Sequence, residues 1–163
     1  MGYSVLDRTK EAGINPDVIT YNTLLSCASR SRQPVEAYMD FKDIFLRNIT
    51  PDPATFNIMI TGLCKNKYID NALMLLRNLQ RNGFRPELVT YNILIDGICK
   101  SGSFKNRMFD EGLEIFLEMK AQGYTFDGFA SCTVAGALLR TGRIKEGNKC
   151  MGIMFRSGID LDM

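Results

Sequence analysis

A short block of residues recurs at a fixed interval along this chain, and the recurrence limits the possible folds more than any other feature. The block reads VITYNTLL from residue 18, PATFNIMI from residue 53 and LVTYNILI from residue 88. Its asparagines, Asn22, Asn57 and Asn92, are 35 residues apart in both steps. Repeats of about this length are single supersecondary units that bury their apolar faces only against their neighbours. The sequence therefore predicts an array of stacked repeats.

Each repeat is predicted to contain two helices. The first should begin around the threonine of the block, just after a stretch of a proline, an acidic residue and two further residues that suits a turn and a helix entry. The second should open at a proline or an aspartate, since both favour a first turn. The predicted starts are Thr20, Thr55 and Thr90 for the first helices, and Pro34, Asp70 and Asp110 for the second helices. Left-handed residues should then end the second helices. These are Asn48, Gly83, Gly123 and Gly158.

The repeats divide the chain into five segments. The fourth copy has Cys132 in place of the asparagine, and the third carries five extra residues near 103–107. We place this insertion in the turn between two helices, as a surface loop or as a basic contact through Lys105 or Arg107. The first 17 residues match the second half of a repeat, so we expect a fragment of a longer array. The segments are 1–17 (half-repeat), 18–52 (repeat 1), 53–87 (repeat 2), 88–127 (repeat 3) and 128–162 (repeat 4).

The composition excludes several classes of function. The 163 residues carry a net charge of +2 and include no histidine. Without histidine the chain lacks the commonest general base, the Ser–His and Cys–His nucleophile pairs and the usual zinc ligand. Its five cysteines are unclustered and fit reduced, buried thiols, so we expect neither a metal site nor a cofactor. Most hydrolase classes are thereby excluded.

The apolar residues and the N-terminus bear on location. No stretch approaches the roughly 20 apolar residues that a membrane helix needs, so no membrane association is expected. The first eight residues, MGYSVLDR, resemble neither a signal peptide nor an Arg- and Ser-rich transit peptide. We therefore expect any targeting segment to be absent from this chain.

At residues 89–102 the chain reads VTYNILIDGICKSG, which is close to the consensus of the pentatricopeptide repeat (PPR) family. It resembles this family rather than the 34-residue tetratricopeptide repeats, because it has no Trp and places its Tyr-Asn pair differently. The resemblance implies an all-α fold, a right-handed superhelical solenoid of stacked antiparallel helical hairpins. It also implies a non-enzymatic, sequence-specific RNA-binding protein of plant mitochondria or chloroplasts, which reads one base per repeat in RNA processing, stabilisation, splicing or translation.

In this family the fifth and thirty-fifth residues of a repeat read one base together, and the second residue packs on that base. By resemblance, the reading pairs are Asn22 with Asp52, Asn57 with Glu87, Asn92 with Asp127, and Cys132 with Asp162. The packing residues are Ile19, Ala54, Val89 and Phe129. The family's code gives uracil for Asn with Asp. Repeats 1 and 3 are therefore each expected to bind a uracil of a single-stranded RNA. Asn with Glu implies a weaker pyrimidine preference, and the Cys132 pair leaves the base of repeat 4 open.

An asparagine–aspartate pair also suits base recognition on chemical grounds. Asn carries a donor group and an acceptor on a short stem, whereas an ionised Asp only accepts. The acid can therefore hold the NH₂ group and fix the direction of the amide, which then meets the Watson–Crick edge of an unstacked base. Alternatively the asparagine column is structural, with each side chain bonded between neighbouring helices.

A basic residue occupies the thirteenth place of every repeat. These residues are Arg30, Lys65, Lys100 and Arg140. Places five, nine and thirteen lie on one stripe of a helix, since residues four apart are neighbours on its surface. Each cation is thus predicted to lie two turns from the base reader, where it could contact a phosphate. The alternative is a solvated helix end that the helix dipole favours.

A different function is also compatible with the sequence. The non-standard Glu87 and Cys132, together with the half-repeat at the start, fit a protein-interaction solenoid, either a subunit of an organellar ribosome or a self-associating scaffold. The aromatic residues beside the asparagines, Tyr21, Phe56 and Tyr91, are predicted to pack in the core rather than to stack on bases.

Overall fold

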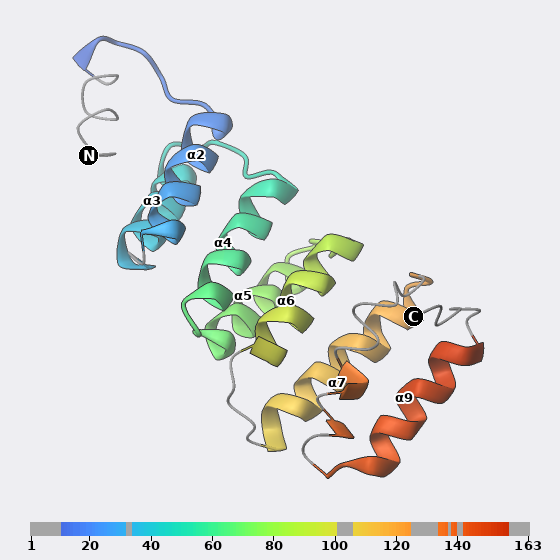
Figure 1. Ribbon diagram of the computed structural model, residues 1–163. Coiled ribbons are helices and arrows are strands. Elements are labelled where there is room, and N and C mark those ends of the chain that lie inside the picture. Colours follow the sequence, from blue (N-terminus) through green and yellow to red (C-terminus); the bar gives the residue numbers. More distant parts are fainter. Residues whose placement is uncertain are drawn as a thin grey trace. The chain divides into compact units, whose positions relative to one another are not determined.

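The regular structure in the described part of the chain is entirely helical. A computed structural model describes residues 11–31, 34–100, 106–124, 134–136, 138–139 and 142–156, and these ranges contain no β-strand. The helices are α2 (Val18–Arg30), α3 (Pro34–Leu46), α4 (Pro53–Lys65), α5 (Ile69–Arg81), α6 (Leu88–Lys100), α7 (Asn106–Ala121) and α9 (Ile144–Arg156) (Figure 1). None of the described helices is long and apolar enough to span a membrane. The predicted all-α class is confirmed.

The chain divides into two compact units. The first unit ends at Leu75 and contains α2, α3, α4 and the first half of α5, and the second unit begins at Leu76. Helices α2, α4 and α6 are the first helices of their repeats, and each has 13 residues. They begin at residues 18, 53 and 88, so the 35-residue interval of the sequence is also the interval between these helices.

Aspartate residues start the first helices two residues earlier than predicted. Asp17 caps α2, and its carboxylate accepts a hydrogen bond from the Thr20 N–H at 2.8 Å. Asp52 caps α4 in the same way, at 2.7 Å from the Thr55 N–H, and the Asp52 N–H donates to the Thr55 hydroxyl at 3.2 Å. This reciprocal capping box satisfies donors that the first turn leaves unpaired. The threonines are therefore the third residues of their helices.

Left-handed residues follow the second helices at the predicted places. Asn48, Gly83 and Gly123 have φ of 54°, 90° and 81°. Glycine, and less readily asparagine, adopts this conformation without the steric conflict that a larger side chain creates. Gly158 lies outside the described residues. Lys67, in the turn after α4, also has a positive φ of 66°, which was not predicted.

The second helices begin close to the predicted residues in two repeats but not in the third. Helix α3 begins at Pro34, as predicted, and α5 begins one residue before the predicted aspartate. Helix α7 begins at Asn106, four residues before the predicted Asp110, and has 16 residues. Asn106 and Arg107 belong to the insertion that we placed in a turn, so part of the extra length of repeat 3 is helical instead. Residues 101–105 lie outside the described part of the chain.

The core of the first unit lies between α2, α3 and α4. Tyr21 and Leu25 of α2, Ile44 of α3 and Met59 of α4 pack in one buried cluster. The buried Tyr21 hydroxyl donates to Asp43 of α3 at 2.5 Å. A buried hydroxyl needs such a partner, because an unpaired one loses its hydrogen bonds with water. The tyrosine therefore belongs to the core, as predicted, and its hydroxyl also joins α2 to α3.

The second unit repeats this arrangement with α6 and α7. Tyr91 is fully buried, and its hydroxyl donates to Glu118 of α7 at 3.0 Å. Arg77 lies 2.7 Å from the same carboxylate. The equivalent residue of repeat 2, Phe56, has no hydroxyl and is half-buried. The core prediction is confirmed for both tyrosines.

The cysteines that the structure describes are free thiols. Cys64 and Cys150 are buried, as expected, and Cys99 is partly buried. Cys27 is exposed, so the prediction of a buried thiol is wrong there. The buried face of α2 is formed by its neighbours Leu25 and Ala28, which leaves Cys27 on the solvent side of the helix.

Candidate nucleic-acid interface

Helices α2 and α4 of the first unit come very close together at Gly62. A Cβ atom on this residue would lie 2.3 Å from Ser29 Oγ and 2.8 Å from Ser29 Cβ, closer than real Cβ atoms come to their neighbours. Gly62 is itself buried in α4. Since side chains in such an interface are close-packed, a larger residue would push the helices apart. Gly62 therefore has a packing role at this position.

Asn66 joins the C-terminal ends of the same two helices. Its side-chain NH₂ donates to the Gly62 carbonyl at 2.8 Å, within α4, and to the Ser29 carbonyl of α2 at 3.3 Å. Backbone carbonyls in the last turn of a helix have no partner within the helix, so this amide satisfies acceptors of both helices. Arg30 and Lys65 are the last residues of α2 and α4, and the contact therefore holds two predicted phosphate-binding residues at the same end.

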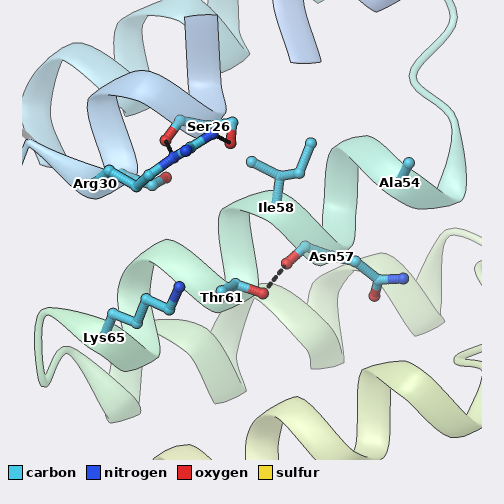
Figure 2. Close-up of a pocket in the computed structure, with 8 residues that line it drawn as sticks. Ser26, Arg30, Ala54, Asn57, Ile58, Thr61 and Lys65 are labelled. Carbon is cyan, nitrogen blue, oxygen red and sulfur yellow. Dashed lines mark hydrogen bonds between the residues drawn. The ribbon is translucent and has the colours of Figure 1, made fainter. Parts of the chain in front are cut away.

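A groove of about 470 Å³ runs between α2 and α4. We call it the α2–α4 groove, and Figure 2 shows its lining. The residues that line it are Ser26, Ser29 and Arg30 of α2 and Ala54, Asn57, Ile58, Thr61 and Lys65 of α4. Those of α4 are three or four residues apart, so they form one face of the helix.

Three classes of predicted site residue meet in this groove. They are the base reader Asn57, the packing residue Ala54 and the two cations Arg30 and Lys65. Figure 2 shows the cations at one end of the groove and Ala54 at the other. Arg30 donates to the Ser26 hydroxyl at 3.0 Å, and within the described ranges neither cation has a carboxylate partner. The groove thus combines positive charge, an amide and an apolar surface.

The first predicted reading pair is in direct contact. Asn22 Nδ2 donates to Asp52 Oδ1 at 3.2 Å, although the two residues are 30 apart in sequence. Burial disfavours the charged form of Asp52, but hydrogen bonds from Thr55 and Asn22 outweigh it and hold the pKa of the carboxyl below its usual value. Asp52 is therefore an ionised acceptor that fixes the direction of the Asn22 amide. Since it also caps α4, the same contact joins α2 to the start of α4.

The acceptor ends of two reading asparagines are buried. Asn22 Oδ1 and Asn92 Oδ1 have no hydrogen-bond partner among the groups that the structure describes. An unpaired buried acceptor costs about 1–3 kcal/mol. A hydrogen-bond donor from a ligand would recover that energy, which favours base reading. The bond from Asn22 Nδ2 to Asp52 joins two neighbouring helices, which favours a structural role. Both interpretations of the asparagine column are compatible with this geometry.

The packing residues of the first three repeats lie on the surface. Ile19 is 69% exposed and Val89 is 48% exposed, and Ala54 is also exposed. Glu87, the predicted reader with Asn57, is exposed as well. These aliphatic groups are accessible to a flat partner such as a base.

In the second unit the basic residue of repeat 3 has an acidic neighbour. Lys100 Nζ lies 2.9 Å and 3.0 Å from the two carboxylate oxygens of Asp96, one helical turn earlier. Sequence reasoning treated Lys100 as equivalent to Arg30 and Lys65, and it missed this pair. The four-residue spacing of an acid and a base was the available signal.

Several predicted site residues cannot be placed. Asp127, Phe129, Cys132, Arg140 and Asp162 lie outside the described residues. Among the residues that are described, no three metal-binding side chains of His, Cys, Asp or Glu gather in one place.

Comparison with known proteins gives two family matches and several structural ones. A model described as "PPR repeat family" matches residues 16–65 and 54–100, and one described as "PPR repeat" matches residues 82–120. The crystal structure of maize PPR10 is 24% identical, with a TM-score of 0.81 over 97% of this chain. This chain spans only 22% of that protein chain. None of the curated proteins matches.

Two similar structures contain RNA. PPR10 in complex with an 18-nt psaJ RNA element is 24% identical, with a TM-score of 0.70, and covers 97% of this chain and 22% of its own. The PPR domain of Arabidopsis thaliana PRORP1, in complex with tRNA, is 16% identical, with a TM-score of 0.79. That match covers 99% of this chain and 82% of the other. At these identities the likeness establishes the fold, which is the array of helical hairpins that the sequence predicted.

Proposed function

Because the chain belongs to the pentatricopeptide repeat family, we propose that it binds single-stranded RNA and reads one base per repeat. The observation that carries the proposal is the α2–α4 groove, in which Asn57, Ala54, Arg30 and Lys65 come together. These residues were selected from separate columns of the repeat, and their meeting on one surface supports a common ligand. The RNA complexes of the related PPR10 and PRORP1 support the same ligand class.

The amide of Asn22 would read the base edge through its acceptor. The ionised Asp52 accepts one hydrogen of its NH₂ group and orients the amide, and the buried Oδ1, which has no partner among the described residues, would have to become accessible before a base could donate to it. Uracil carries a donor, N3–H, at the centre of its Watson–Crick edge, whereas adenine and cytosine carry an acceptor there. An acceptor on the protein therefore favours uracil over these two bases. By the family's code, repeats 1 and 3 would both take uracil.

The other two kinds of residue would hold the rest of the nucleotide. Ile19, Ala54 and Val89 offer aliphatic surface for the face of a base. Aromatic stacking contributes about 1–3 kcal/mol per base, and we expect an aliphatic contact to contribute less. Arg30 and Lys65 supply positive charge at the far end of the groove. Electrostatic attraction to phosphates dominates nucleic-acid affinity, so two placed cations suffice even though the net charge is only +2.

The chain would act without chemistry of its own, by positioning, protecting or remodelling RNA. The plant relatives support a role in a mitochondrion or chloroplast, in RNA processing, stabilisation, splicing or translation. The short groove predicts modest affinity for this chain alone, and longer arrays would bind more tightly.

Replacing Asn22 by threonine, with Asp52 retained, tests base reading. By the family's code the preference of repeat 1 should change from uracil to guanine, since threonine presents a hydroxyl where the amide was. The measurement is a set of binding curves for single strands that differ at one nucleotide. Thr23→Ser, on the exposed side of the same helix, is the matched control. Unchanged base preference in the Asn22 variant would show that the column is structural.

A second candidate function is association with protein, and the outer face of α3 favours it. Val35, Tyr38, Met39, Phe45 and Leu46 are all more than half exposed there. A contiguous apolar surface of this kind is more typical of interfaces than of solvated helices. If it mediates self-association, the sedimentation coefficient should rise with protein concentration, and Phe45→Lys should abolish the rise. A constant monomer value would remove self-association and leave only a different protein partner.

A further inference from the structure

The residue one turn before the predicted phosphate-contacting residue differs in charge between repeat 3 and the two repeats before it. Arg30, Lys65 and Lys100 are the last residues of α2, α4 and α6. The residues one turn earlier are Ser26, Thr61 and Asp96. Two of these are neutral and one is acidic, although all three occupy the ninth place of their repeats.

The neutral residues leave the cations charged. The Ser26 hydroxyl accepts a hydrogen bond from the Arg30 guanidinium at 3.0 Å, which removes no charge. The Thr61 hydroxyl donates to the backbone carbonyl of Asn57 at 2.6 Å and so is directed along its own helix. Both cations therefore retain a full positive charge for a phosphate.

Asp96 has the opposite effect on Lys100. Its two oxygens lie 2.9 Å and 3.0 Å from the ammonium group, so the pair has no net charge. The lysine side chain is 74% exposed and the aspartate 37% exposed. An exposed ion pair of this kind is weak, and a phosphate could displace it. The carboxylate would nevertheless remain beside the phosphate and repel it at a distance shorter than the Debye length.

We propose that Asp96 suppresses the phosphate contact of repeat 3 by neutralising Lys100, and so limits the affinity of the array for RNA at this repeat. This inference rests on the proposed function. It means that repeat 3 would read its base without the electrostatic contribution that Arg30 and Lys65 make. RNA would consequently be held less tightly at repeat 3 than at repeats 1 and 2.

Asp96→Asn in the full chain tests the inference, because it removes the charge and keeps the size of the side chain. We expect binding of a uridine-rich single strand to become about threefold to tenfold tighter at low salt. The slope of log affinity against log salt should steepen by about 0.7, the contribution of one single-strand phosphate. Lys100→Ala alone should change affinity less than twofold, and it should cancel the gain when combined with Asp96→Asn.

The matched control is Glu114→Gln, which also removes one negative charge, at an exposed position of α7. An equal gain from this control, or a gain from Asp96→Asn that survives Lys100→Ala, would overturn the inference while RNA binding itself stands. Loss of affinity in Lys100→Ala as large as in Lys65→Ala would also overturn it. If the unmodified chain binds no RNA, the proposed function fails, and this inference fails with it.

Discussion

A chain in which Arg30 and Lys65 are both replaced by alanine is expected to bind a uridine-rich single strand at least tenfold more weakly than the unmodified chain. The two residues end parallel helices that Gly62 and Asn66 hold together, so one stretch of RNA can contact both. Each lost phosphate contact should flatten the salt dependence by about 0.7, hence by about 1.4 for the pair. Binding should fall for all sequences alike, since phosphate contacts carry no base information.

Fluorescence anisotropy with uridine-rich and adenine-rich strands, at about 50, 100 and 200 mM salt, measures both the affinity and the slope. Lys42→Ala combined with Lys120→Ala is the matched control, because it removes the same charge from exposed positions on the second helices α3 and α7. Equal losses in the two double variants would mean that only net charge matters. The α2–α4 groove would then have no special role in binding.

Replacing Asp40 by leucine is expected to stabilise the chain at neutral pH. Asp40 is only 6% exposed, yet it occupies the repeat position that Leu75 and Ile115 fill in the next two repeats. Burial, followed by the negative charges of Asp43 and Glu36, raises the pKa of Asp40 from 3.8 to about 6. An ionised carboxylate at an apolar position is destabilising, because it loses its hydration and, among the described residues, no cation pairs with Asp40.

The direction of the pH dependence follows from that shift. The folded state holds its proton up to about pH 6, whereas the unfolded chain releases it near pH 4. The contribution of Asp40 to stability is therefore complete below about pH 4, declines between about pH 4 and pH 6, and is lost above that range. One pKa unit corresponds to about 1.4 kcal/mol, and solvent screening reduces the effect, so we expect a loss of about 1–3 kcal/mol.

Urea unfolding of the full chain at several pH values between about 4 and 7 measures this loss. Asp40→Leu should raise the free energy of unfolding at pH 7 by about 1–3 kcal/mol and remove the Asp40 contribution to the pH dependence. Asp40→Asn should remove the pH dependence with a smaller gain, because its amide stays polar. Glu11→Gln, at an exposed residue near the N-terminus, is the control. Destabilisation by both Asp40 variants at every pH would show that the carboxylate has a favourable partner.

Features that depend on residues close in sequence could be predicted. The 35-residue interval, the pairs of helices and the left-handed residues at Asn48, Gly83 and Gly123 all follow from periodicity and from end signals within a few residues. Two local errors had local causes. Capped by Asp17 and Asp52, α2 and α4 begin two residues before the predicted starts, and α7 extends into the insertion of repeat 3. The Asp96–Lys100 pair was also readable from its spacing.

The sequence by itself determined that these residues form helical hairpins with the asparagine, the ninth residue and the basic residue along one stripe, because a helix places residues four apart on the same side. Only the tertiary structure decided that Arg30 and Lys65 share one groove and that Asn22 meets Asp52. It also decided that the charged Asp40 is buried. These features depend on how closely two helices pack, and the packing is set by contacts such as that of Gly62 with Ser29, between residues distant in sequence.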